Sequence, residues 1–143
     1  MKMLWIAMAA GTICFADQKI KLEDMPAAVQ AAVKEQSKGA TIKGFSKEVE
    51  HGKTSYEAEM TVNGHAKDVS FDAAGKVVSV EEETSIDTIP APTRDAIQKA
   101  VGTGKLQKVE TVTENGKTFY EAAIKTGAKS QEVKFDAAGK TVK

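Results

Sequence analysis

The sequence contains one cysteine and one tryptophan, and both lie within residues 1–16. The rest of the chain therefore offers no disulfide, no cysteine metal site and no thiol nucleophile. Histidine is also scarce, since only His51 and His65 are present. We expect both in turns at opposite ends of one strand, about 40 Å apart at about 3.3 Å per residue, which is too far for a shared metal ion or one catalytic triad. We predict a protein that is not an enzyme and has no catalytic residue, metal ligand or cofactor.

The sequence also lacks an excess of either charge, because 20 lysine and arginine residues balance 20 aspartate and glutamate residues. A nucleic-acid-binding protein needs a basic face to neutralise phosphates. Attraction to anionic lipid likewise needs clustered basic residues. We therefore expect neither nucleic acid nor a lipid surface as the partner.

Residues 1–16 have the pattern of a secretory signal peptide. Lys2 is followed by an uncharged, mostly apolar stretch that is too short to span a bilayer, and Cys14-Phe15-Ala16 offers a small-x-small cleavage site. The alternative is lipoprotein processing with Cys14 as the first mature residue, but the preceding residues match that motif poorly. We predict cleavage before Asp17 and a periplasmic or secreted chain that keeps no membrane anchor.

The most informative pattern is an internal repeat with an offset of 64 residues. Gly52-Lys53-Thr54 recurs as Gly116-Lys117-Thr118, and residues 71–76 recur as residues 135–140. Self-similarity of this kind indicates a duplicated structural unit. We predict a first repeat at residues 17–83 and a second repeat at residues 84–143.

Each repeat has the pattern of one helix followed by four short strands. Residues 26–37 and 90–101 have the composition and apolar stripe of amphipathic helices that begin with proline. In the first repeat, turn residues separate strand-like segments at 42–49, 54–62, 67–71 and 77–82. The loops His51–Gly52 and Asn63–Gly64 predict two-residue hairpins. The predicted fold class is α+β: two tandem repeats, each one helix packed on a four-stranded antiparallel meander.

Two acidic features have simple structural interpretations. Asp72-Ala73-Ala74-Gly75 and its copy at 136–139 begin like calcium loops, but alanine stands at the intermediate ligand positions, so hairpin turns are predicted. The run Glu81-Glu82-Glu83 is interpreted as a solvated linker between the repeats.

Three segments carry a resemblance to a known family. Residues 25–33, 52–58 and 71–76, repeated in tandem, resemble the PepSY-like proteins grouped with the beta-lactamase inhibitor protein. The resemblance covers essentially the whole mature chain. It implies an α+β fold and, more loosely, a periplasmic or secreted protein that binds and inhibits another protein.

One difference between the repeats predicts a binding site. If Asn115–Gly116 is a two-residue loop, Val112 opposes Phe119 on the sheet face away from the helix, where the first repeat has Glu48 and Ser55. Ala123 replaces Glu59 on the same face. An aromatic beside β-branched neighbours is typical of interaction hot spots. We predict that Val112, Phe119 and Ala123 bind a partner; the alternative is that they pack against the first repeat.

These patterns predict an exported, non-enzymatic module that binds a protein or peptide client, as an inhibitor of a protease or another envelope enzyme. Two alternatives remain open: a periplasmic sensor that responds to a small ligand or metal, and a structural envelope protein. A sensor should contain a cavity or a carboxylate cluster. A binding module should instead present one contiguous, partly apolar surface on the sheet.

Overall fold

The structure is a computed structural model that describes residues 18–142. The predicted signal peptide at residues 1–16, Cys14 and the predicted cleavage site lie outside the described residues. The elements in chain order are β1 (Gln18–Lys19), η1 (Leu22–Asp24), α1 (Ala27–Gln36), β2 (Thr41–Glu50), β3 (Lys53–Val62), β4 (His65–Asp72), β5 (Val77–Glu83), η2 (Ile86–Thr88), α2 (Ala91–Val101), β6 (Lys105–Glu114), β7 (Lys117–Thr126), β8 (Lys129–Phe135) and β9 (Thr141–Val142).

The predicted fold class is wrong in how it groups these elements. The nine strands of residues 18–142 form one antiparallel sheet in the order β1 to β9, so the chain is not two units of one helix on a four-stranded meander. The two halves join where β5 pairs with β6, from Ser79 opposite Glu114 to Glu83 opposite Glu110. Pairing of these strands satisfies backbone groups that two separate meanders would leave exposed at their edges.

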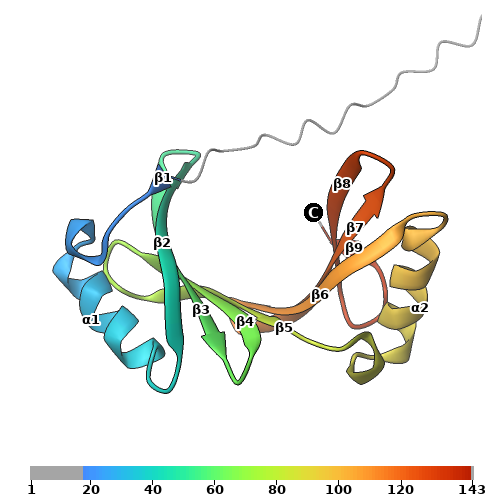
Figure 1. Ribbon diagram of the computed structural model, residues 1–143, viewed down its shortest axis with the longest axis horizontal. Helices are drawn as coiled ribbons and strands as arrows, with labels where there is room; N and C mark the ends of the chain where they lie inside the picture. The colour runs from blue at the N-terminus through green and yellow to red at the C-terminus, as the bar shows by residue number, and fades with distance from the viewer. Residues whose placement is uncertain (1–17, 143) are drawn as a thin grey trace, which may run out of the picture.

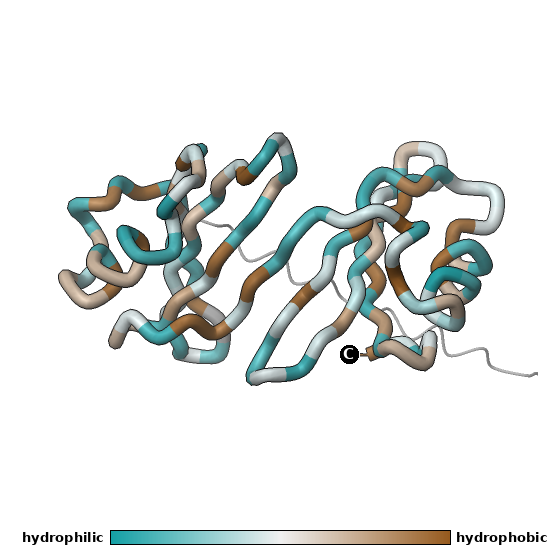
Figure 2. Tube along the Cα trace, turned by 90° about the horizontal axis from the view of Figure 1, so that it is seen from below, coloured by the Kyte–Doolittle hydropathy of each residue, from teal (hydrophilic) through white to brown (hydrophobic). Residues whose placement is uncertain are grey.

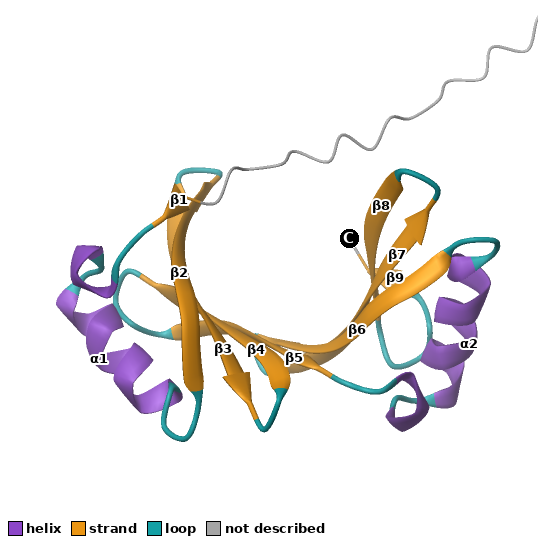
Figure 3. Ribbon diagram, in the orientation of Figure 1, coloured by secondary structure: helices purple, strands orange, loops and turns teal. Residues whose placement is uncertain are grey.

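The sheet curves, and both helices lie on its outer, convex side (Figure 1). Helix α1 packs over the N-terminal half of the sheet and α2 over the C-terminal half, while β5 and β6 occupy the middle of the arch (Figure 3). Within the described residues no helix covers the concave side. The curvature therefore leaves one broad sheet face without a covering layer.

Apolar and polar residues alternate along several strands (Figure 2), as in β3, where Tyr56, Ala58 and Met60 are buried between less buried residues. The side facing α1 buries a core cluster that includes Val29, Ala58, Met60 and Phe71. The side facing α2 buries a second cluster that includes Ile97. Each helix therefore has its own core, although the sheet beneath the two helices is continuous.

The short hairpin loops have the predicted backbone conformation. His51, Asn63 and Asn115 have φ between 49° and 51°, and a glycine with positive φ follows each of them. Left-handed pairs of this kind are required by two-residue hairpin loops. They set the registers of β2 with β3, β3 with β4, and β6 with β7.

The two Asp-Ala-Ala-Gly segments are turns, as predicted, and they also position the helices. Asp72 Oδ1 accepts hydrogen bonds from the backbone N–H groups of Ala74 and Lys76, both at 2.9 Å. Gly75 lies so close to α1 that a Cβ atom there would be 2.5 Å from the Ala28 carbonyl oxygen. Gly139 approaches the Pro92 carbonyl oxygen of α2 equally closely. Glycine is therefore required at both turns for the helices to pack against the sheet.

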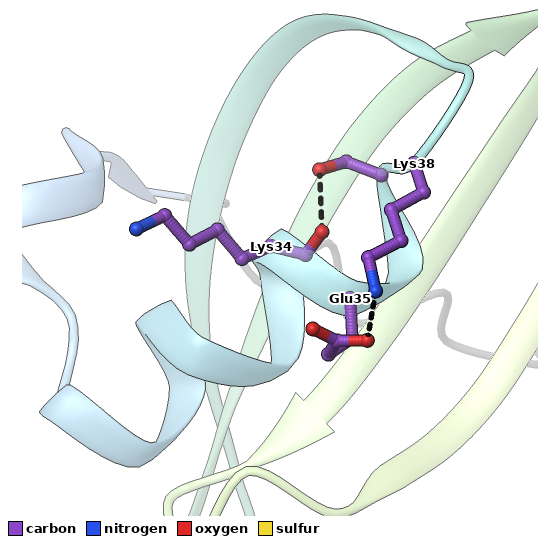
Figure 4. A network of polar contacts seen from close by, with 4 residues as sticks. Lys34, Glu35 and Lys38 are labelled. Atoms are coloured by element: carbon purple, nitrogen blue, oxygen red, sulfur yellow. Dashed lines mark hydrogen bonds and ion pairs between the residues drawn. The ribbon is translucent and has the colours of Figure 1, made fainter.

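Helix α1 ends in an exposed polar network (Figure 4). Lys38 Nζ lies 2.6 Å from Glu35 Oε2, and the Ser37 hydroxyl donates to the Lys34 carbonyl oxygen at 3.5 Å. Both side chains of the ion pair are largely exposed. Such surface pairs contribute little to stability, which makes Glu35 a suitable control position for charge substitutions.

Candidate functional site

The concave face of the sheet is the candidate functional site. It is the inner side of the curved sheet, and no helix of residues 18–142 lies over it (Figure 1). Val112 on β6 is 0% exposed, although it belongs to neither core cluster. Glu110, two residues earlier on the same strand, is only 4% exposed. The face therefore has an ordered, tightly packed centre.

The predicted binding residues lie on this face. Val112 pairs with Phe119 in the predicted register, and it also pairs with Glu81 of β5. Phe119 and Ala123 are partly buried on β7, whereas Val112 contributes no accessible surface. Val112 thus supports the junction between the two halves of the sheet. Phe119 and Ala123 are the members of the predicted set that a partner can reach.

The ammonium group of Lys134 lies over the ring of Phe119. Lys134 Nζ of β8 lies 5.8 Å from the ring centroid and 3.1 Å from Glu114 Oε1. An ammonium group over an aromatic ring is attracted by the electron-rich ring face. The concave face therefore already holds one lysine between a carboxylate and an aromatic ring.

Ala123 also lines an open depression of about 610 Å³ at the C-terminal end of the face. The depression lies beside the β-bulge between Leu106 and Lys108 and the hairpin that joins β7 to β8. Its walls are Gln107, Ala123, Ile124, Lys129, Ser130, Gln131 and Glu132. Polar side chains and apolar surface both line this open depression, and an open, mixed wall suits contact with a protein surface better than enclosure of a small apolar ligand.

The centre of the face is acidic. Asp68 of β4, Glu81 of β5 and Glu110 of β6 each place a carboxylate oxygen within 4.8 Å of the other two. Lys108 Nζ pairs with Glu110 Oε1 at 2.7 Å. These residues come from three adjacent strands, and β5 links β4 to β6. The junction that the sequence does not predict is therefore what assembles the cluster.

Burial and mutual repulsion shift the protonation of these carboxyl groups. Burial, together with the charges of Glu121 and Glu110, raises the pKa of Glu81 to about 7 from 4.5. Burial and neighbouring carboxylates also raise the pKa of Asp68 and of Glu121. Burial alone would lower the pKa of Lys108, but its hydrogen bond to Glu110 and the surrounding carboxylates raise it. The lysine stays charged while Glu81 titrates near neutral pH.

Sequence reasoning missed this cluster and misinterpreted part of it. The strand predicted at 77–82 is present as β5, but the interpretation of the glutamate run as a solvated linker is wrong, because Glu81 and Glu83 pair with Val112 and Glu110 of β6. The alternation of β3, with Glu57 and Glu59 between buried residues, was the available signal for an acidic sheet face. That signal does not show which other strands continue the face.

The two histidines lie apart from this site. His51 is in the loop between β2 and β3, and His65 begins β4 after the opposite end of β3. Both are exposed. In addition, none of the helices in residues 18–142 is long and apolar enough to cross a membrane.

Comparison with known proteins shows the fold. No protein-family model and no curated protein matches the chain. Among solved structures, a protein from Bacteroides eggerthii described as periplasmic is similar with a TM-score of 0.67 and 19% identity, covering 83% of this chain and 86% of that one. A DUF2874 family protein from Bacteroides uniformis gives a TM-score of 0.64 and 21% identity over 82% and 86% of the two chains.

A third solved structure bears on the resemblance drawn from the sequence. A BLIP-like protein from Bacteroides fragilis is similar with a TM-score of 0.59 and 23% identity, over 83% of this chain and 84% of that one. This likeness supports a fold like that of the beta-lactamase inhibitor protein, while the PepSY-like part of the resemblance is not confirmed. The predicted periplasmic or secreted location agrees with the description of the Bacteroides eggerthii protein.

Proposed function

We propose that this chain is an exported, non-enzymatic module that binds a protein client on the concave face of its sheet. The observation that carries the proposal is a sheet face that spans both halves, that no other element of residues 18–142 covers, and that displays Phe119 and Ala123 beside a buried centre. Aromatic side chains in well-packed surroundings are the usual anchors of protein interfaces.

Two further observations support the proposal. The fold is shared with a BLIP-like protein, and fold-level analogy favours a binding role for this chain, with inhibition of a protease or another envelope enzyme as its proposed form. The description of a structural neighbour as periplasmic supports action in the envelope. The site itself lies on strands, which hold side chains more precisely than loops do.

A capture experiment tests this function. The mature chain, immobilised as bait for an envelope extract of its source organism, should retain a client that the Ala123→Trp bait loses, because the indole blocks the concave face. Ala31→Trp is the matched control, since Ala31 is exposed on α1. Unchanged thermal midpoints establish that both variants fold. Retention of the same client by all three baits would contradict binding on the concave face.

A second candidate function is a metal-responsive envelope sensor. It is favoured by one observation, the carboxylate cluster of Asp68, Glu81 and Glu110. Hard divalent cations such as Ca²⁺ prefer oxygen ligands of this type. Titration of the purified chain with calcium chloride in a calorimeter separates the two functions: saturable binding that is lost in Asp68→Asn would favour the sensor.

A further inference from the structure

The concave face of the sheet is rich in negatively charged side chains. The chain carries no formal net charge. Nevertheless, the register places Glu57, Asp68, Glu81, Glu110 and Glu121 on five adjacent strands of the same face. Negative charge is therefore concentrated on the face that no helix of residues 18–142 covers, where Lys108 and Lys134 lie among the carboxylates.

The chain's own lysines compensate this charge only in part. Lys108 pairs with Glu110, and Lys134 pairs with Glu114. Around Glu81, every neighbouring charge that shifts its protonation is a carboxylate: Glu121, Glu110, Glu57 and Asp68. Like charges held this close repel one another, and a cation supplied from outside would relieve the repulsion.

We infer that the segment of the client that docks on the concave face is cationic and presents lysine or arginine side chains to the carboxylates of β3 to β7. This inference rests on the proposed function and specifies the chemistry of the partner. On this same face, Lys134 Nζ lies between the Glu114 carboxylate and the Phe119 ring. A cation of the partner would bind in the same way, between a carboxylate and an aromatic ring.

The breadth of the face favours a protein segment over a single metal ion. Neighbouring strands lie about 4.8 Å apart, so the five strands from β3 to β7 that carry these carboxylates extend over roughly 19 Å. A metal ion would use only the central cluster of Asp68, Glu81 and Glu110. Outside that cluster, Glu121 on β7 lies two residues from Phe119, so the face can match more than one cationic side chain on a segment.

A defined probe tests the inference. An arginine–glycine repeat peptide, blocked at both ends, is titrated into the mature chain at physiological ionic strength, with a glutamate–glycine peptide as the negative probe. The double variant Glu81→Gln/Glu121→Gln should bind the arginine peptide at least about tenfold more weakly than the wild-type chain does. The control Glu35→Gln/Asp95→Asn removes the same number of carboxyl groups from exposed positions on the helices and should stay within about twofold of wild type.

Further readouts separate the inference from its rivals. Affinity for the arginine peptide should rise as the pH is raised through about 7, where Glu81 ionises. Equal weakening in both double variants would overturn the inference, because the attraction would then follow net charge alone. Displacement of the peptide by calcium chloride at a stoichiometry of one ion would overturn it in favour of a metal. A concentration-dependent dimer that is lost in Glu81→Gln/Glu121→Gln would overturn it in favour of a second copy.

The outcomes also distinguish this inference from the proposed function. A client that depends on Ala123 in the capture experiment, but that the arginine peptide does not displace, leaves the binding function standing and overturns the cationic partner. Displacement of that client by the arginine peptide, and not by the glutamate peptide, supports both.

Discussion

Lys134 Nζ lies 5.8 Å from the centroid of the Phe119 ring, and Val112 lies opposite Phe119 on the neighbouring strand. The aromatic ring is therefore held from two sides on the concave face. A side chain that is fixed before binding loses little conformational freedom when a partner docks. This arrangement makes Phe119 the residue of the predicted set most suited to anchor a client.

Replacing Phe119 with serine, the residue at the equivalent position 55 of the first repeat, should weaken client binding by about 1 to 4 kcal/mol. Calorimetry with the captured client measures the change. Val49→Ser is the matched control. Val49 is 51% exposed on β2 and, unlike its neighbour Glu48, lies on the side of the sheet away from the concave face. A large fall of the thermal midpoint in Phe119→Ser, with unchanged affinity, would assign the ring to packing between the halves of the sheet.

The raised pKa of Glu81 predicts that stability falls as pH rises. Its pKa is about 7 in the folded chain against 4.5 as the ordinary value, so between these values the folded state binds more protons than the unfolded state. The shifts of Asp68 and Glu121 have the same sign, while Lys108 remains charged throughout this window. The thermal midpoint should therefore be several degrees higher at about pH 5 than at about pH 8.

Glu81→Gln tests the origin of that pH dependence. The amide removes the titrating group and its repulsion, so the variant should be more stable than wild type at about pH 8 and should lose much of the dependence on pH. Thermal unfolding followed by circular dichroism gives both quantities. An undiminished pH dependence in Glu81→Gln would place its source in other groups.

The turn glycines next to the helices should be less tolerant of substitution than the glycines in open loops. Gly75→Ala and Gly139→Ala combine a left-handed backbone with a Cβ contact of 2.5 Å to a helix carbonyl, and each should cost about 2 to 4 kcal/mol. Gly52 has φ +76° and nothing within 4 Å of its Cβ position, so Gly52→Ala should cost only about 1 kcal/mol. Similar losses of stability in all three variants would show that the close approach of the two turns to the helices does not add to the cost of the substitution.

A hydrogen bond that only the second half makes gives another stability prediction. Thr93 is fully buried on α2, and its hydroxyl donates to the Asp136 carbonyl oxygen at 2.9 Å. The first repeat has Val29 at the equivalent position, also fully buried. Because the Gly139 N–H also donates to that carbonyl, Thr93→Val should cost about 1 kcal/mol or less in chemical denaturation. A loss several times larger would mean that the hydroxyl holds the turn against α2.

Local patterns in the sequence predicted the elements, and the missing information was long-range. The X–Gly loops at His51, Asn63 and Asn115 require left-handed backbone at both residues, which is why the hairpins and the Val112–Phe119 register could be predicted. The pairing of β5 with β6 spans η2 and α2 in the chain, and no local turn signal specifies it. The grouping into two separate units was wrong for that reason.

The same limit explains why the sequence did not predict the acidic cluster. Asp68 and Glu81 become neighbours through the β4–β5 hairpin, but Glu110 joins them only because β6 is the next strand in the sheet. Alternation along one strand gives the side on which a residue lies and not its neighbours across the sheet. The run at Glu81–Glu83 therefore had the composition of a linker and the position of a central strand.

Site-specific photo-crosslinking tests the central claim most directly. Benzoylphenylalanine is introduced in place of Ala123 on the concave face or of Ala31 on the exposed surface of α1, and each chain is irradiated with its captured client. Binding on the concave face predicts a covalent client adduct from position 123 and none from position 31. An adduct from position 31 alone, or equal adducts from both positions, would contradict the account.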